Sequence, residues 1–307
     1  MFLPRLNIRM IRRSYFMRVI LKRPLYTVCT MCTVVLLTGL WFGPVSARDN
    51  AFERLQEKLA ADGFDPEKIN ALYQNPTVRF AHRSVSLFFM HSESRLNYNQ
   101  FTSSISIRKA KKYLRAHERA LTRTERKYQV DREVITAIIL VETRLGKMVG
   151  KSRVLNTLST MAALEDSDAR ENLWQLIPAD RRLSRDQFEK KADKKSGWAY
   201  TELKALLRYT FAEGIDPATI RGSYAGAMGI CQFMPSNISR LAADGNNDGR
   251  IDLFNHDDAI ASVANYLKHY GWKPGLSLKN AHKVIRRYNN SRPYADTILT
   301  VANLLRS

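Results

Sequence analysis

The stretch that decides the fold is residues 130–145, which read VDREVITAIILVETRL. Apolar residues from Val134 to Val141 point in every direction around a helix, which is typical of a helix buried in a core. One carboxylate, Glu142, ends that run. Apolar surroundings make a charged carboxylate costly and raise its pKa, so it would hold a proton near neutral pH, as a general acid must. The alternative is that the helix turns Glu142 to the surface, where basic neighbours screen it.

Helical periodicity also dominates the chain on both sides of this stretch. Gly63-Phe64-Asp65-Pro66 predicts the end of one helix, followed by an N-cap and a proline at the first position of the next. Residues 107–128 alternate basic with apolar side chains at 3.6 spacing, which predicts one long solvated helix. The polar stretches 183–196 and 244–252 predict excursions from the core. No internal repeat occurs, and no alternating pattern is long enough for a large sheet.

Composition limits the class of protein. A chain of 307 residues with 45% hydrophobic and 25% charged residues is long enough for one elaborated domain or two, which excludes a disordered or low-complexity chain. The formal net charge is +20, and residues 48–307 carry +13 of it, with 42 basic against 29 acidic residues. Such a body is attracted to nucleic acid, anionic lipid or an acidic wall polymer, and charge alone does not choose among them.

The N-terminus predicts the compartment. Seven basic residues and no acid precede or flank an uncharged stretch whose centre, Val34–Phe42, is strongly apolar. It ends in Val45-Ser46-Ala47, small residues that a signal peptidase accepts. Residues 1–47 therefore predict an export signal and a periplasmic or cell-envelope location, where no nucleic acid partner is expected. The alternative is an uncleaved anchor that holds the body at the membrane, because about 20 uncharged residues can span a bilayer.

Cysteine usage offers no redox chemistry. Cys29 and Cys32 lie inside the export segment, so the exported chain would keep only Cys231 and form no internal disulfide. No histidine lies within 20 residues of Cys231 to activate its thiol. We therefore predict that Cys231 is a small packed side chain.

Residues 222–236, which read GSYAGAMGICQFMPS, combine small residues with polar and aromatic ones. Closely spaced glycines let the backbone approach a ligand, while Ser223, Gln232 and Phe233 are side chains suited to a carbohydrate. Taken alone, the segment fits a tight packing turn between helices equally well.

Residues 244–255, which read DGNNDGRIDLFN, match most of an EF-hand calcium loop. The predicted metal ligands are the side chains of Asp244, Asn246, Asp248 and Asp252 and the carbonyl of Arg250. The twelfth position should be a bidentate carboxylate and is Asn255, so any calcium would be structural and weakly held. The alternative is a surface loop rich in Asx turns.

Four segments together resemble the ordered motifs of the lytic murein transglycosylase B family. They are Val141–Gly146, Gly222–Ser236, Ser262–Tyr266, and Arg287–Ser291 with Tyr294-Ala295. The resemblance implies a mainly α fold, in which a lysozyme-like helical catalytic core follows a helical N-terminal region and carries a small inserted subdomain with the EF-hand-like loop. The implied division is an N-terminal region at 48–130 and a core at 131–307, with excursions near 165–197 and 244–255.

The chemistry that the resemblance implies needs one carboxylate. Glu142 would protonate the β-1,4 glycosidic oxygen between N-acetylmuramic acid and N-acetylglucosamine in peptidoglycan. As a carboxylate it would then take the proton from the muramoyl 6-hydroxyl, which attacks C1 and leaves a 1,6-anhydromuramoyl end without hydrolysis. An internal nucleophile has a high effective concentration, so no second carboxylate and no cofactor is required. The enzyme would act as a monomer on glycan strands.

The resemblance also implies substrate-binding residues. They are Ser223, Gln232, Phe233, Met234, Tyr266, Tyr288, Asn289 and Tyr294. Ser223 and Gln232 would hold sugar N-acetyl and hydroxyl groups, and the aromatic rings would line the cleft. Phe233 and Tyr266 also stand at helical spacing from apolar neighbours and fit plain core residues.

The chain departs from the family pattern after Leu158. A basic pair for stem-peptide carboxylates is expected there, and Asp166, Asp168, Arg170 and Glu171 stand in its place. The alternative function is a noncatalytic peptidoglycan-binding module, which would keep the aromatic residues but would not need an acid inside an apolar helix.

Overall fold

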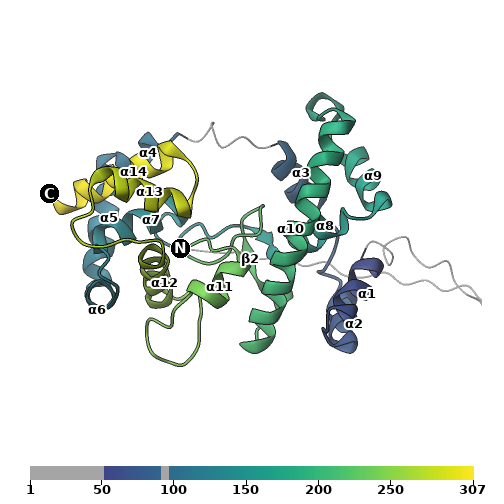
Figure 1. Cartoon of the computed structure of the whole chain (residues 1–307), viewed down its shortest axis with the longest axis horizontal. Coiled ribbons are helices and arrows are strands. Elements are labelled where there is room, and N and C mark those ends of the chain that lie inside the picture. The colour runs from purple at the N-terminus through teal and green to yellow at the C-terminus, as the bar shows by residue number, and fades with distance from the viewer. Residues whose placement is uncertain (1–51, 91–96) are drawn as a thin grey trace, which may run out of the picture. The chain divides into compact units, whose positions relative to one another are not determined.

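The computed structural model describes residues 52–90 and 97–307 (Figure 1). The predicted export segment 1–47 lies outside these residues. The described part is mainly helical, as predicted, and its only sheet consists of two antiparallel strands of two residues each. None of its helices is both long enough and apolar enough to pass through a bilayer.

One group of helices packs around α8 and α10, on the right of Figure 1, and extends to α11 near the centre. Its members are α1 (Glu53–Ala61), α2 (Pro66–Gln74), α3 (His82–Met90), α8 (Val154–Ala163), α9 (Ser167–Leu176), α10 (Arg185–Ala212) and α11 (Pro235–Leu241). Four short elements lie between these helices in the sequence. They are β1 (Ser152–Arg153), η2 (Ala179–Arg181), η3 (Pro217–Thr219) and β2 (Arg221–Gly222). The helix α8 is buried along its whole length, so it forms the core of this group.

A second group surrounds α7, on the left of Figure 1. Its members are α4 (Asn99–Thr102), α5 (Ser104–Ala116), α6 (Glu118–Tyr128), α7 (Arg132–Thr143), α12 (His256–His269), α13 (Leu278–Tyr288) and α14 (Arg292–Arg306). The helix α7 packs against α5, α12 and α14, and residues 134–140 are all buried. The core helix predicted at 130–145 is therefore confirmed, with its ends two residues inside the predicted ones.

The predicted turn before Pro66 is also confirmed. Gly63 has φ +89°, and α2 begins at Pro66. The Asp65 carboxylate accepts hydrogen bonds from the backbone N–H groups of Glu67 and Lys68 at 3.0 and 3.2 Å. An aspartate in this position satisfies donors that a helix start leaves without an intrahelical partner.

The single long helix predicted at 107–128 is wrong, because the chain breaks at His117 into α5 and α6. His117 adopts φ −112° and ψ 24°, outside helical values. Its ring packs against Tyr113 and His256, with ring centroids 4.2 and 4.5 Å away. The ring from α12 thus occupies the joint between the two helices, a tertiary contact that local periodicity does not report.

The stretch predicted as an excursion at 183–196 forms the first turns of α10, which continues for 28 residues to Ala212. Ser184 and Gln187 cap its start reciprocally through side chain and backbone. The buried side chains Phe188 and Ala192 already lie within this polar stretch. A polar composition therefore concealed a helix that leads directly into the core.

Candidate active site

The carboxylate of Glu142 lies at the end of α7, one residue before the helix stops. The three residues after Thr143, which are Arg144, Leu145 and Gly146, have φ values of 51°, 64° and 82°. Consecutive left-handed residues cannot continue an α-helix, so the chain turns away sharply. The Glu142 side chain is half-buried at this turn, between the core and the surface.

Thr143 ties the end of α7 to the glycine-rich segment 222–236. Its side chain is fully buried, and its hydroxyl donates to the carbonyl of Ile230 at 2.8 Å. The same oxygen accepts a hydrogen bond from the Gly146 N–H at 3.0 Å. Sequence reasoning assigned Thr143 no role, because a threonine in a helix carries no signal of a partner 87 residues away.

Tyr294 holds the carboxylate of Glu142. This tyrosine is 2% exposed at the start of α14, and its hydroxyl donates to Glu142 Oε1 at 2.6 Å. Burial, followed by the nearby charge of Glu142, raises the pKa of Tyr294 well above its ordinary value. The phenol therefore stays neutral and remains a donor throughout the neutral range.

Cys231 and Tyr288 also lie near enough to Glu142 to sense its charge. Tyr288 donates its hydroxyl to the Cys231 carbonyl at 2.5 Å. Burial raises the pKa of the Cys231 thiol to about 12, with a contribution from the charge of Glu142. A thiol that is fully buried and resists ionisation is a packed side chain and not a nucleophile, which confirms the prediction for Cys231.

Three aromatic rings pack beside this cluster. The Phe233 ring lies 5.6 Å from the Tyr266 ring and 6.0 Å from the Tyr288 ring, and the last two are 4.7 Å apart. Phe233 and Tyr266 are only 2% and 6% exposed, whereas Tyr288 is half-buried. Phe233 and Tyr266 thus support the cluster from inside, and Tyr288 is the member that also reaches solvent.

The glycine-rich segment is held by its own polar side chains. The Ser223 hydroxyl oxygen accepts hydrogen bonds from the N–H groups of Ala225 and Ala227 at 3.2 and 3.0 Å. Gln232 has φ +51° and donates its amide to the carbonyls of Gly229 and Val149 at 2.8 and 3.1 Å. The Val149 contact joins Gln232 to the loop that follows Glu142. The Oε1 atom of Gln232 accepts no hydrogen bond from the described residues, so an acceptor stays available for a ligand.

Two glycines let these loops approach each other. The strands β1 and β2 pair Ser152 with Gly222. A Cβ atom on Gly150 would lie 1.9 Å from the Gly222 carbonyl oxygen, and one on Gly222 would lie 2.1 Å from that of Ala227. Gly150 also has φ +104°, which only glycine adopts readily. The loop after Glu142 and the segment 222–236 therefore come together through backbone contact.

Asn289 and Met234, the remaining predicted residues, lie at helix boundaries next to the cluster. Asn289 follows Tyr288 as the C-cap of α13, and Met234 follows Phe233 as the N-cap of α11. Both are half-buried. Tyr294 thus contacts Glu142, and Tyr288 contacts the Cys231 carbonyl and the rings of Phe233 and Tyr266. Gln232, Met234 and Asn289 adjoin these residues along the chain, and Ser223 lies in the same segment 222–236.

The loop 244–255 is a network of Asx turns. The Asp244 carboxylate accepts hydrogen bonds from the N–H groups of Asn247 and Gly249 at 2.6 and 2.8 Å. Asn255 caps α12 by accepting from the Asp257 N–H at 2.8 Å. Within residues 52–90 and 97–307, no three His, Cys, Asp or Glu side chains gather closely enough to hold a metal ion. Carboxylates alone therefore do not form a metal site, and calcium would also need amide and carbonyl oxygens of the loop as ligands.

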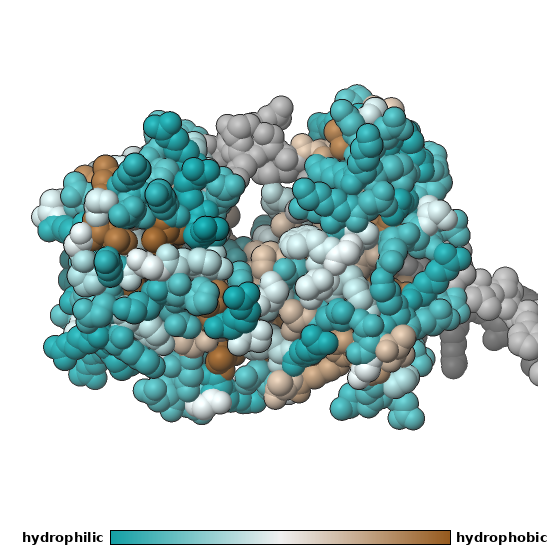
Figure 2. Space-filling view, viewed as in Figure 1, coloured by the Kyte–Doolittle hydropathy of each residue, from teal (hydrophilic) through white to brown (hydrophobic). Residues whose placement is uncertain are grey.

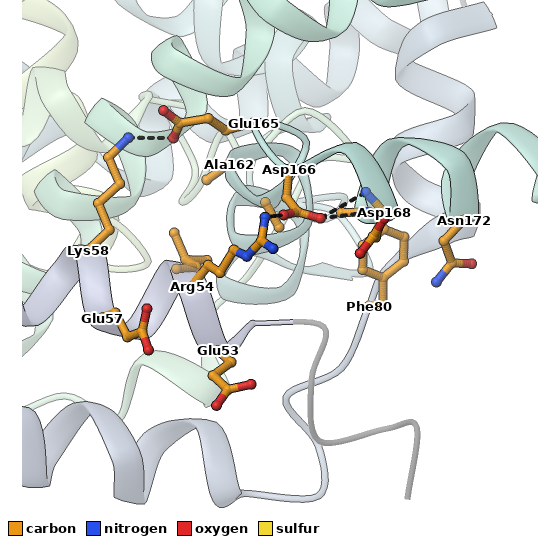
Figure 3. Close-up of a pocket in the computed structure, with 13 residues that line it drawn as sticks. Glu53, Arg54, Glu57, Lys58, Phe80, Ala162, Glu165, Asp166, Asp168 and Asn172 are labelled. Carbon is orange, nitrogen blue, oxygen red and sulfur yellow. Dashed lines mark hydrogen bonds and ion pairs between the residues drawn. The ribbon is translucent and has the colours of Figure 1, made fainter.

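A cavity of about 670 Å³ lies elsewhere, between α1 and the turn from α8 to α9 (Figure 3). Two ion pairs join its walls, Arg54 with Asp166 and Lys58 with Glu165. It includes none of the predicted site residues. Asp166 stands where the family pattern predicts a basic residue. Its carboxylate forms an ion pair with Arg54 and caps the start of α9. The candidate active site therefore rests on the contacts around Glu142 and not on this cavity.

Comparison with known proteins identifies a family match. The sequence profile described as "Transglycosylase SLT domain" matches residues 47–281. Membrane-bound lytic murein transglycosylase B of Escherichia coli K12 is 38% identical over 159 residues, which cover 52% of this chain and 37% of that protein. The chain thus spans little more than a third of the curated relative that it matches.

Solved structures share the fold. Soluble lytic transglycosylase SltB1 of Pseudomonas aeruginosa matches with a TM-score of 0.67 at 24% identity, covering 83% of this chain and 97% of that one. Lytic transglycosylase Slt35 of Escherichia coli in complex with calcium gives 0.65 at 22%, covering 86% and 95%. SltB3 of Pseudomonas aeruginosa in complex with NAG-anhNAM-pentapeptide gives 0.65 at 20%, covering 84% and 80%.

Proposed function

The chain belongs to the transglycosylase SLT-domain family, and we propose that it is a lytic murein transglycosylase that cleaves peptidoglycan with Glu142 as its catalytic carboxylate. The observation that carries this proposal is the hydrogen bond from buried Tyr294 to Glu142 Oε1 at the end of a core helix. A carboxyl group that a neutral, buried donor holds in one position is oriented to exchange a proton with a substrate.

The surroundings of Glu142 support a mechanism with one carboxylate. Glu142 is the carboxylate whose charge helps to raise the pKa values of Cys231 and Tyr288. Enzymes that retain or invert through two carboxylates place the second one across the scissile bond. The transglycosylase reaction does not need it, because the substrate supplies the nucleophile.

Proton transfer through Glu142 balances the reaction. The protonated side chain gives its proton to the glycosidic oxygen as the bond from C1 to that oxygen breaks. The resulting carboxylate removes the proton from the 6-hydroxyl of the muramoyl residue as that oxygen bonds to C1. Glu142 ends protonated and the products are an anhydromuramoyl end and a free 4-hydroxyl, so no water is consumed.

The substrate-binding residues remain those predicted, with roles that follow from their contacts. The available Oε1 of Gln232 suits a sugar N–H, and the Ser223 hydroxyl, whose oxygen is occupied by two backbone donors, has its own proton left to donate. Tyr288 offers its partly exposed ring to a sugar face. Asn289 and Met234 extend the surface, while Phe233 and Tyr266 hold Tyr288 in place.

Product analysis tests the function. Purified protein is incubated with murein sacculi, and the released ends are separated by mass. We expect 1,6-anhydromuramoyl ends and loss of turbidity. Reducing ends instead would show hydrolysis, and binding to sacculi without any release would indicate a noncatalytic binding module; either result would overturn the proposal.

We also propose that the loop 244–255 binds calcium weakly, as a brace with no part in the chemistry. Asp244, Asn246, Asp248 and Asp252 supply oxygen atoms and Arg250 a carbonyl, and the Slt35 relative was solved in complex with calcium. Asn255 gives neither a charge nor a bidentate carboxylate, so the loop fits the ion only in part.

Asn255→Asp should strengthen calcium binding by roughly tenfold, because aspartate keeps the helix cap and adds a charged oxygen at the twelfth position. The measurement is the melting temperature during a calcium titration into the millimolar range. Asp248→Asn is the matched control and should lower the response below that of the unmodified protein. If none of the three proteins responds to calcium, the loop is a turn network only.

The N-terminal sequence and the name of the Escherichia coli relative, which is membrane-bound, support a location in the cell envelope. We propose that the protein is exported to the cell envelope by residues 1–47 and acts there as a monomer on glycan strands, without a nucleic acid partner. N-terminal sequencing of the exported protein distinguishes cleavage after Ala47 from an uncleaved anchor, and a protein found only in the cytoplasm would contradict the location.

A further inference from the structure

The consecutive helices α5 and α6 carry a large excess of positive charge. Residues 104–128 contain nine basic residues and two acidic ones, a net charge of +7 within a chain total of +20. We call their outward side the basic face. Its exposed members are Arg108, Lys109, Lys112, Arg115, Arg119, Arg123, Arg126 and Lys127. In Figure 2, the region that Figure 1 labels α6 is hydrophilic.

Hardly any of this charge is neutralised within the protein. Arg123 pairs with Asp257 at 2.9 Å, and the Glu125 carboxylate is used by Arg132 at 2.6 Å. The other basic side chains of the face form no ion pair with the described residues. Arg108 and Lys112 stand four residues apart, as do Arg119 and Arg123, and such like-charged pairs destabilise a helix by about 0.2–0.5 kcal/mol each. A bound polyanion would relieve this repulsion.

The apolar sides of both helices are already used. Ala110 and Tyr113 of α5 and Ala120 and Leu121 of α6 are buried, and the two helices pack against α7 and α12 respectively. Ile105 is the one large apolar side chain exposed on residues 104–128. A face with a single exposed apolar side chain suits a hydrated charged polymer better than a lipid bilayer.

We propose that the basic face binds the carboxylates of peptidoglycan stem peptides and holds the enzyme on a wall strand other than the one being cleaved. The inference rests on the proposed function, because that function makes the sacculus the polyanion this protein meets. Residues 166–171, where the family pattern predicts a basic pair, contain three acidic residues and one arginine, and the basic face supplies positive charge at another place in the chain. Arg108, Lys112 and Arg115 are exposed on the side of α5 opposite the buried Ala110 and Tyr113, so a ligand bound there does not displace the packing of α5.

The test measures binding to intact sacculi in a Glu142→Gln background, so that the polymer survives the assay. The reversal set is Arg108→Glu, Lys112→Glu, Arg115→Glu and Arg119→Glu. We expect its affinity for sacculi at about 50 mM salt to fall at least tenfold, and the salt dependence of binding to flatten, because screening acts on the lost attraction. With glutamine at the same four positions, the affinity for sacculi should also fall, but by less. A loss that follows the charge in this way argues against a folding defect.

The matched control reverses four exposed basic residues on other elements. They are Lys68, Arg79, Lys190 and Lys194, which form no ion pair with the described residues. This set has the same net charge and should bind sacculi within about twofold of the background protein. With Glu142 restored, the basic-face set should also cleave short soluble glycan fragments at the unmodified rate, because the residues of the candidate active site are unchanged.

Three results would overturn the proposal. Equal losses in both charge sets would show attraction by net charge alone, and no loss in the basic-face set would show that the face does not bind. If the basic-face set lost binding to phosphatidylglycerol vesicles but kept its binding to sacculi, the face would be assigned to a membrane. Absence of anhydro products from the unmodified protein would instead defeat the proposed function, and the binding measurement would still be readable.

Discussion

Glu142→Gln is expected to lower the rate of anhydromuramoyl end formation by roughly a thousandfold or more, the upper part of the range for loss of a general acid and base. Glutamine keeps the shape of the side chain, and its Oε1 can still accept the hydrogen bond from Tyr294. It has no proton to give to the glycosidic oxygen and no charge with which to remove one. The measurement is the initial rate of end formation on sacculi, with the melting temperature recorded for the same protein.

Glu133→Gln is the matched control, since Glu133 lies in the first turn of the same helix. Its carboxylate is near Arg306, 3.9 Å away, and no predicted site residue contacts it. This variant should keep activity within about twofold. If Glu142→Gln keeps more than a tenth of the activity, or if both variants lose it equally, Glu142 does not perform the chemistry.

The sequence predicted the helix that carries Glu142 because continuous apolar burial is a local property of residues 130–145. It did not predict how that helix ends. The left-handed run Arg144-Leu145-Gly146 includes two residues that usually avoid that region, and it persists because Thr143 bonds both Ile230 and Gly146. The termination therefore depends on a segment more than 80 residues away, beyond the reach of capping rules.

The break at His117 has the same cause. Residues 107–128 satisfy a helical period throughout, and only the ring of His256 from another helix explains why the chain bends between α5 and α6. Periodicity describes one helix and its burial, and cannot report which side chain a distant helix brings to it. The start of α10 shows the opposite case, in which a local signal was present. Ser184 and Gln187 form a capping box, but the polar composition of residues 183–196 favoured an excursion instead of a helix.

For the site, the sequence indicated which residues gather but not how each takes part. Tyr294 and Phe233 were both expected to line a cleft. The structure gives Tyr294 a hydrogen bond to Glu142, whereas Phe233 is buried behind Tyr288. Both are aromatic residues in the motifs. Their different roles depend on packing, because α14 packs against α7 and so brings Tyr294 to Glu142.

Tyr294→Phe is expected to move the alkaline limb of the pH profile of kcat/KM to higher pH and to lower the rate by about tenfold to a hundredfold. Activity requires protonated Glu142 in the free enzyme, so the alkaline limb reports the loss of that proton. The phenol of Tyr294, whose pKa burial raises well above its ordinary value, donates to the carboxylate and stabilises its charged form. Removing this donor makes the carboxylate harder to form, so the proton is kept to higher pH. The rate falls because Tyr294 positions the carboxyl group.

Tyr288→Phe is the matched control for this positioning role. It removes a buried phenol whose pKa is likewise raised by burial, but that phenol donates to the Cys231 carbonyl and not to Glu142. Its alkaline limb should stay with that of the unmodified enzyme, although substrate affinity and stability can both change. A purely structural role for Tyr294 would lower the rate of Tyr294→Phe without moving its alkaline limb. An unmoved limb in Tyr294→Phe, measured on a protein whose melting temperature shows that it is folded, would therefore remove Tyr294 from the control of the catalytic proton.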